Sequence, residues 1–340
     1  MNTNTLTELG SDFSHLKIAV AGDFCLDRYF EIDPYAEEIS LETGLPVHNL
    51  KRVRCQPGAA GTVVNNLAAL QIDEIIPIGF CGKDGEGWEL KNALASIQGI
   101  NMDRFIESED RCTFTYSKPL LMWSDRQPEE LSRLDRKNTT PTPPSLTETL
   151  SHSLNLLSSH VDAVILMDQV DLTDTGVVND YFLSMLKSLT QEKPDLPVIA
   201  DSRRGLQNYP PLVFKMNHHE LSRMTGKKVS RRLEDIQKEC LHVASHNQRP
   251  VIVTMAEMGM ATADVEGQFF HQSSIPVRGE IDIVGAGDSV TANLAAALGA
   301  GRPVDQAIQL ATLASSIVIH KLGTTGTASI REMIDLAERQ

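Results

Sequence analysis

The sequence predicts an α/β protein with one doubly wound, mostly parallel sheet flanked by helices, and a small β flap outside it. Two observations support this prediction. Short apolar runs alternate with helical patterns along most of the chain, and each connection is long enough for parallel strand pairing. The chain has 340 residues, of which 41% are hydrophobic, so it can bury a large core. We expect one domain over residues 1–340.

The first half of the chain is expected to supply two strands of the main sheet and the whole flap. The strands are predicted at 17–22 and 74–80, and helices with regular apolar spacing at 62–71 and 88–97. The segments 28–57 and 111–135 show irregular alternation with charged residues between. We assign both segments to the flap, which would act as a lid.

The second half of the chain repeats the alternation of strand and helix. The strands are predicted at 161–168, 197–201, 213–217 and 250–255, and the helices around 146–157, 176–190, 219–226, 231–246, 287–299 and 304–321. Parallel strands end at one edge of a sheet, and ligands of open α/β sheets gather at that edge. Polar residues that follow these strands are therefore candidate site residues.

The charge balance and the cysteines restrict the partners of the protein. The chain carries 31 Lys and Arg against 45 Asp and Glu, a net charge of -14, which repels nucleic acid and anionic membranes. We therefore expect small-molecule partners, no nucleic acid and no membrane. The five cysteines form no CxxC pair, and the N-terminus shows neither a cationic start nor a long apolar run. These features predict a cytoplasmic location.

The sharpest motif is the segment DIVGAGD at 282–288, which precedes a helix rich in small residues. Gly285, Ala286 and Gly287 would let main-chain N–H groups bind a phosphate at the helix start, where the helix dipole also favours an anion. Asp288 would be repelled by that anion, so it makes sense as a general base for an attacking hydroxyl. The alternative is a turn followed by an ordinary acidic residue of the first helical turn. Spacing alone leaves both interpretations open.

A second candidate cluster follows the strand at 213–217. Asn217 and Glu220 are three residues apart at the start of the next helix, where an amide and a carboxylate can hold a hydrated Mg²⁺. The alternative is an ordinary helix cap, in which Asn217 binds the amide near Glu220. Thr254 and Gly259 add a hydroxyl and a permissive backbone near the same sheet edge.

These motifs resemble those of the ribokinase-like (PfkB) carbohydrate kinases over nearly the whole chain. The two signatures of that family correspond to PGAAGTVVNNLAAL at 57–70 and DIVGAGDSV at 282–290. Within the family, the chain looks most like the heptose-7-phosphate kinase half of bifunctional ADP-heptose synthases. That likeness lies in GDFCLDRYF at 22–30, VTMAEMGM at 253–260 and HKLGTTGT at 320–327.

The resemblance implies a ribokinase-like fold, ATP and Mg²⁺ as cofactors, and roles for individual residues. Asp288 would be the base, and Gly285 to Gly287 the anion hole. The implied substrate-binding residues are Asp27, Gly58 and Thr62, and the implied nucleotide-binding residues are Asn217, Glu220, Thr254, Gly259, Asp282 and Gly323. Asn217 and Glu220 would organise Mg²⁺ through water, and a monovalent cation such as K⁺ could bind near Asp282. A homodimer through the lid is also implied.

Several positions depart from the family pattern, mostly on the acceptor side. Thr62 stands where the first signature usually has a sugar-binding Asn, and Ala59 replaces a common Gly. Gln56 stands where the heptose kinases tend to have Arg, and Asp171 lies near a position where they often carry Lys. Met255 takes a polar or basic position beside the nucleotide. A threonine offers one hydroxyl where an amide offers both donor and acceptor, so the hydrogen bonds to a sugar must differ.

A basic cluster in the lid could replace the lost basic positions. Lys51, Arg52 and Arg54 lie close together, and in a strand the last two would point to the same side. One hypothesis is that these arginines grip a substrate phosphate. The alternative is a solvated face or a guarded edge strand.

Residues and resemblance together predict ATP-dependent phosphorylation of a hydroxyl on a sugar or sugar phosphate, with a heptose 7-phosphate-like acceptor favoured by the resemblance. One alternative is a catalytically silent sensor of sugar phosphates or nucleotides with the same fold, which the departures at Thr62, Gln56 and Met255 favour. Another is a nucleoside kinase, which the 5% aromatic content does not favour.

Overall fold

A nine-stranded sheet forms the centre of the protein in a computed structural model, which describes residues 1–323 and 325–339. The strand order is β14-β13-β12-β11-β10-β9-β1-β4-β5. All neighbours from β12 to β5 pair in parallel, and β13 and β14 form an antiparallel edge. The bounds are β1 (Lys17–Gly22), β4 (Glu74–Gly82), β5 (Phe105–Ser108), β9 (Ala163–Asp168), β10 (Val198–Ser202), β11 (Val213–Asn217), β12 (Val251–Thr254), β13 (Met260–Ala263) and β14 (Phe269–Gln272). The predicted doubly wound, mostly parallel sheet is confirmed.

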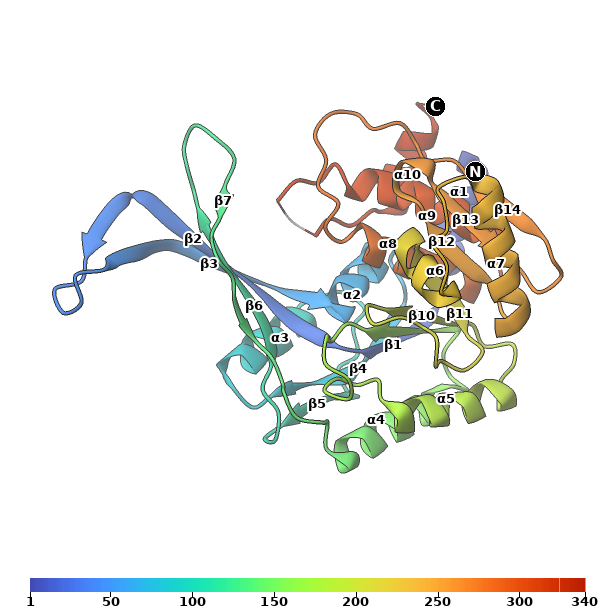
Figure 1. Ribbon diagram of the computed structural model, residues 1–340, viewed down its shortest axis with the longest axis horizontal. Helices are drawn as coiled ribbons and strands as arrows, with labels where there is room; N and C mark the ends of the chain where they lie inside the picture. The colour runs from blue at the N-terminus through green and yellow to red at the C-terminus, as the bar shows by residue number, and fades with distance from the viewer. Residues whose placement is uncertain (324, 340) are drawn as a thin grey trace.

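Helices cover both faces of this sheet, as Figure 1 shows. The central strands are therefore apolar on both sides: every residue of β9 is buried, and every residue of β1 after Lys17. One face packs against α1 (Thr3–Phe13), α2 (Ala60–Ala69), α3 (Gly85–Ala95), α8 (Ala286–Gly299), α9 (Val304–Val318) and α10 (Ile330–Ala337). The other face packs against α4 (Pro144–Leu157), α5 (Asp180–Glu192), α6 (His218–Thr225) and α7 (Leu233–Asn247).

A second, smaller sheet projects from the main body (Figure 1). It contains β2 (Phe24–Ile39), β3 (Pro46–Ala59), β6 (Phe114–Leu121), β7 (Glu129–Glu130) and β8 (Leu134–Arg136). β2 pairs with β3 in antiparallel and with β6 in parallel orientation, and β7 and β8 both pair with β6. These strands occupy the two segments that the sequence assigned to the flap. The β2–β3 hairpin extends well beyond the main sheet.

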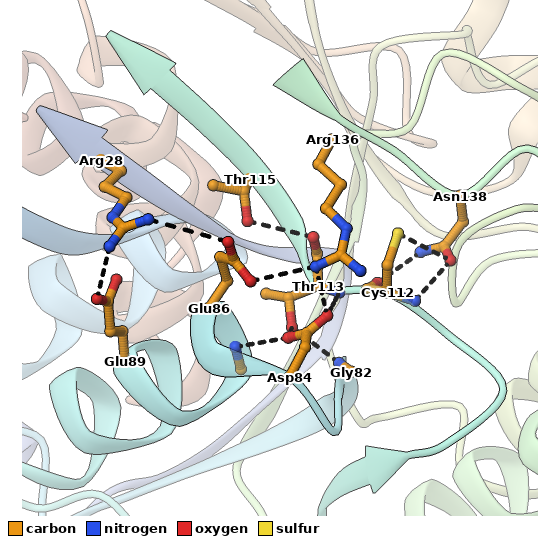
Figure 2. Close-up of polar contacts among 11 residues, drawn as sticks. Arg28, Gly82, Asp84, Glu86, Glu89, Cys112, Thr113, Thr115, Arg136 and Asn138 are labelled. Atoms are coloured by element: carbon orange, nitrogen blue, oxygen red, sulfur yellow. Dashed lines mark hydrogen bonds and ion pairs between the residues drawn. The ribbon is translucent and has the colours of Figure 1, made fainter. Parts of the chain in front are cut away.

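A polar network joins the base of the second sheet to the start of α3, as Figure 2 shows. Asp84 caps α3 by accepting from Gly87 N at 2.8 Å, and it also accepts from Thr113 Oγ1 at 2.6 Å and Arg136 Nη1 at 2.9 Å. Arg28 of β2 binds Glu89 at 2.9 Å. Burial would raise the pKa of Asp84, but the bonds from Thr113, Gly87 and Arg136 lower it overall. The network fixes where the second sheet leaves the body.

Some elements lack a strong sequence signal and were not predicted. The helix α1 buries only Leu6, Leu9 and Phe13, and α10 buries Met333 and Leu336. The strand β5 has four residues, and β13 and β14 have four each. Such short elements take their conformation from tertiary packing more than from local propensity. The predicted helix at 304–321 ends earlier, at Val318.

Candidate active site

Asp288 lies in the first turn of α8, and this helix begins after Gly285, whose backbone conformation only glycine adopts easily. Gly285 has φ 81° and forms the N-cap of α8 without a side-chain hydrogen bond. Ala286 N–H donates to Ile283 O at 3.2 Å; among residues 1–323 and 325–339, no hydrogen bond uses the N–H groups of Gly287 and Asp288. The helix start therefore offers two main-chain donors to an anion. Ala286 N–H, which the sequence placed in the anion hole, is engaged in the turn instead.

The Asp288 carboxyl is poised to exchange a proton near neutral pH. Burial and the neighbouring Asp201 carboxylate raise its pKa to about 7, although Lys215 opposes the shift. Asp27 from the second sheet also raises this pKa, so its charge lies within electrostatic reach of Asp288. The side chain keeps partial contact with solvent. A carboxyl group with these properties suits a general base.

An ion pair from β10 and β11 lies beside this helix start. Lys215 Nζ binds Asp201 Oδ2 at 2.6 Å, and Thr291 Oγ1 of α8 donates to the same oxygen at 3.1 Å. A Cβ atom added to Gly287 would lie 3.1 Å from Lys215 Nζ. Burial would lower the pKa of Lys215, but Asp201 raises it overall, so the ammonium stays charged. Sequence reasoning missed Lys215; its one signal is a basic residue inside the apolar run VFKMN.

The predicted acceptor residue Asp27 lies on the face of the second sheet that its neighbours Tyr29 and Lys118 share. Lys118 Nζ binds Asp27 Oδ1 at 2.9 Å and lies 4.9 Å from the centre of the Tyr29 ring. A Cβ atom on Gly58 would come within 2.6 Å of Asp27 Oδ2, so only glycine leaves room for this carboxylate. Gly58 is thus needed to seat Asp27. Lys118 was not singled out from the sequence.

Three of the departures from the family pattern, Gln56, Ala59 and Thr62, lie where β3 passes into α2. Thr62 is buried in the first turn of α2, and Ala59, just before α2, has φ 52° and ψ −118°, a strained backbone for a residue with a Cβ. Gln56 Nε2 donates to Tyr29 Oη at 3.3 Å and to Thr325 Oγ1 at 3.0 Å. Arg54 binds Glu31 at 2.7 Å and stacks 4.5 Å from the Tyr29 ring centre.

The Asn217 and Glu220 pair forms a helix cap in the structure. Asn217 Oδ1 accepts from His219 N and Glu220 N at 2.9 Å each, and Glu220 Oε2 accepts from Asn217 N at 2.7 Å. Burial raises the pKa of Glu220, although the bond from Asn217 opposes the shift. Among the described residues, no group of three or more His, Cys, Asp or Glu could hold a metal ion.

The other predicted nucleotide-binding residues lie near the ends of neighbouring strands. Thr254 ends β12 and donates to Met216 O at 3.5 Å. Gly259 has φ 89°, and a Cβ there would lie 2.0 Å from Gln272 O, so strand packing requires glycine. Met255, directly after Thr254, has its side chain buried in the core, so it offers no polar group at this edge of the sheet.

Asp282 and Gly323 come together at the edge of the site. Asp282 Oδ2 accepts from Gly323 N at 3.3 Å, and Oδ1 accepts from Val284 N at 3.0 Å. Both residues line a surface hollow that Gln127, from the loop between β6 and β7, also lines. In this hollow, a loop of the second sheet therefore lies next to the loop that precedes α8.

The family model of pfkB family carbohydrate kinases matches residues 17–331. The chain belongs to this family. Its resemblance to HldE proteins is also confirmed: the bifunctional protein HldE of Gluconobacter oxydans is 30% identical over 95% of this chain, and that of Actinobacillus succinogenes is 29% identical over 96%. The chain spans 64% of the length of each, less than two thirds.

Solved structures of the same fold agree with this assignment. Ribokinase of Arabidopsis thaliana complexed with ribose and ATP matches with a TM-score of 0.69 at 19% identity, and phosphofructokinase-2 of Escherichia coli in complex with potassium with 0.71 at 16%. Each match covers 95% of this chain and 99% of the other. The ribokinase-like fold and the prediction of a carbohydrate kinase are confirmed.

Two buried carboxylates in this pfkB family carbohydrate kinase support the site without facing it. Asp23 Oδ2 accepts from Gln169 N and Val170 N, and Oδ1 from Val177 N, so it organises the loop after β9. Burial raises its pKa to about 7. Asp168 binds Arg204 at 3.0 Å. No helix within residues 1–323 or 325–339 has the length and apolarity needed to cross a membrane.

Proposed function

We propose that this kinase transfers the γ-phosphoryl group of ATP to a hydroxyl of a phosphorylated sugar, with heptose 7-phosphate as the first candidate. The likeness to the HldE proteins over nearly the whole chain supports this acceptor. The observation that carries the chemistry is the position of Asp288, whose carboxyl has a pKa of about 7 and lies beside unused main-chain donors, opposite Asp27. Asp288, the free main-chain donors and Asp27 would then supply the base, the anion hole and the acceptor ligand that a phosphoryl transfer requires.

In the proposed reaction, Asp288 accepts the proton of the acceptor hydroxyl, and the hydroxyl oxygen attacks the γ-phosphorus in line. The new P–O bond forms as the bond to the β,γ-bridging oxygen breaks, and ADP leaves with the electron pair of that bond. The N–H groups of Gly287 and Asp288 donate to oxygens of the migrating phosphoryl group. Asp27 holds a sugar hydroxyl, and Thr62, in the first turn of α2, adds a single hydroxyl where relatives use an amide.

Asn217 and Glu220 are the residues that would hold Mg²⁺ through water. Glu220 Oε2 is engaged by Asn217 N, whereas Oε1, which lies 3.8 Å from Arg223, can still accept from a metal-bound water. Mg²⁺ keeps several waters and needs few protein ligands, so the free Oε1 of Glu220 fits it through water, while Asn217, whose Oδ1 already accepts two main-chain N–H bonds, would hold Glu220 in place. When bound with ATP, it neutralises phosphate charge. Asp282 and Gly323 would border the nucleotide, with a K⁺ ion near Asp282, and Thr254 and Gly259 would contact the nucleotide.

An anionic acceptor is supported by the cations on the inner face of the second sheet. Lys118 and Arg54 both lie against the Tyr29 ring, at 4.9 and 4.5 Å from its centre. Their present partners are Asp27 and Glu31. A phosphate could share these cations with the two carboxylates, which a neutral sugar would not do.

The second sheet would close over the acceptor as a lid within one domain of residues 1–340, and water would be excluded. Its projecting hairpin exposes Tyr35, Ile39, Leu41 and Leu45, with Leu41 fully accessible. Such an apolar group on a projecting ribbon favours pairing with the hairpin of a second copy. Light scattering of the purified protein tests this homodimer. A monomer at micromolar concentration, or a dimer that survives a change of Leu41 and Leu45 to Ser, would contradict it.

The decisive experiment measures ADP release with MgATP and a panel of sugars, sugar phosphates and nucleosides. We expect turnover with a sugar phosphate, heptose 7-phosphate being the best, and a loss of about 10² to 10⁴ in turnover for Asp288→Asn. Asp305→Asn, in the first turn of α9, is the matched control and should leave the rate unchanged. Turnover with nucleosides alone, or binding of a sugar phosphate without any ADP release, would favour the nucleoside kinase or the silent sensor.

A further inference from the structure

The Lys215 ammonium is placed at the phosphate-binding turn by two neighbours from different elements. Asp201 Oδ2 at the end of β10 holds Nζ at 2.6 Å, and Thr291 of α8 donates to that same carboxylate oxygen at 3.1 Å. The lysine side chain is 8% exposed. The ammonium group is therefore held in one position with its last atoms toward Gly287, 3.1 Å from where a Cβ would be.

Neutralising the Asp201 charge does not by itself explain why the Lys215 ammonium lies beside Gly287. An ammonium group has three donors, and within residues 1–323 and 325–339 its recorded hydrogen bond is the one to Asp201. A buried ion pair is often no more stable than apolar residues of similar size, so stability is a weak reason to keep one. Its position beside the free Gly287 amide offers a stronger reason.

The charges around the turn also call for a cation. Asp201 binds the Lys215 ammonium at 2.6 Å, and the carboxyl groups of Asp288 and Glu220 lie in the first turns of α8 and α6 near it. Three carboxyl groups would repel the γ-phosphate of ATP from the main-chain donors of α8. A second cation that influences Asp288 is Arg203, whose side chain is 58% exposed and pairs with Asp171. Lys215 is the buried cation at the place where phosphate charge must be carried.

We propose that Lys215 is a further catalytic residue, which donates from Nζ to an oxygen of the γ-phosphoryl group beside the N–H groups of Gly287 and Asp288. Asp201 and Thr291 are positioning residues that aim it. This inference rests on the proposed ATP-dependent transfer. Lys215 keeps its proton throughout: its charge offsets the negative charge that moves from the γ-phosphoryl group to the leaving ADP.

The test compares binding of AMP-PNP and ADP, both with Mg²⁺, by calorimetry. Lys215→Met should weaken the binding of AMP-PNP by about tenfold or more relative to that of ADP, because only AMP-PNP carries the γ-phosphoryl group. The same variant should lower kcat by about 10² to 10³. Lys227→Met, which breaks the 3.1 Å pair with Glu239 at the far end of α6, is the matched control and should change neither. Equal loss of both nucleotides, or an unchanged kcat, overturns the proposal.

A second variant separates charge from folding. Lys215→Met leaves the buried Asp201 carboxylate without its cation, which can prevent folding; the double variant Lys215→Met with Asp201→Asn removes both charges of that pair. If Lys215 only neutralises Asp201, the double variant should regain wild-type kcat and nucleotide preference. If Lys215 binds the γ-phosphoryl group, the double variant should fold but still show the lowered kcat and the lost preference for AMP-PNP. A wild-type protein that binds AMP-PNP but phosphorylates no sugar refutes the proposed function, while the nucleotide comparison still decides the role of Lys215.

Discussion

Gln56 donates a hydrogen bond from Nε2 to Thr325 Oγ1 at 3.0 Å, which joins β3 of the second sheet to the loop beside the start of α8. Thr325 also lies against Gly285, since a Cβ added to that glycine would be 3.2 Å from the Thr325 Cβ. One contact thus links β3 to the turn before α8 that we propose binds phosphate. The sequence marks Gln56 as a departure from the family but does not reveal this partner.

Gln56→Ala should weaken the binding of both substrates by a small and equal factor, because it removes the hydrogen bond that joins β3 to the loop beside α8. A neutral hydrogen bond contributes about 0.5 to 1.5 kcal/mol, which corresponds to about 2- to 12-fold in KM. Thr325→Val should have the same effect, and the double variant no more than either. Additive effects in steady-state kinetics would show that the two residues act separately.

The rate of the kinase should depend on the ionisation of Asp288. The base acts only when deprotonated, and its pKa is raised to about 7, so kcat/KM should rise with pH and level off above that value. Below it, the rate should fall about tenfold per pH unit. The measurement is kcat/KM for the sugar phosphate from pH 5.5 to about 9 in buffers of constant ionic strength. A profile that is flat down to pH 5.5 contradicts the assignment.

Ala59→Gly should stabilise the protein, against the usual effect of such a change. Ala59 has φ 52° and ψ −118°, which strains a residue with a Cβ, and glycine relieves that strain. We expect the free energy of unfolding in urea to rise by about 1 kcal/mol. Ala68→Gly, within the regular part of α2, is the control and should lower it by a similar amount. The same sign for both variants would rule out strain at Ala59.

Asp84→Asn should loosen the base of the second sheet, in a manner that depends on pH. Asparagine keeps the cap of α3 but loses the charged bond to Arg136. Because Arg136 is half exposed, we expect a loss of about 1 to 2 kcal/mol at pH 7 in urea unfolding. The folded protein lowers this pKa, so the contribution is present above the unfolded pKa near 3.8 and disappears as pH falls through the lowered value. A difference in the free energy of unfolding between wild type and variant that stays constant down to pH 3 would contradict this.

Predictions from the sequence succeeded where a pattern is local. The buried runs of β1 and β9 and the regular spacing of α4 and α7 indicate their own conformation, because apolar periodicity reflects the faces each element buries. The elements that were missed, such as β5 and β13, are four residues long and depend on the neighbours that cover them. The cap formed by Asn217 and Glu220 is equally local, and its signature was visible.

The site divides in the same way. Asp288 and the glycines before it can be recognised from the sequence as a candidate site because the glycine-rich turn and the helix that follows it are contiguous in the chain. Lys215, Asp201 and Thr291 meet from three elements, and Lys118 reaches Asp27 from another strand of the second sheet, so no spacing along the chain announces these contacts. The order of residues along the chain determines the local conformational preferences and the contacts between residues close in sequence. Which distant charges share one pocket depends on how the whole chain packs, and that packing sets the pKa of Asp288 and the place of its cation.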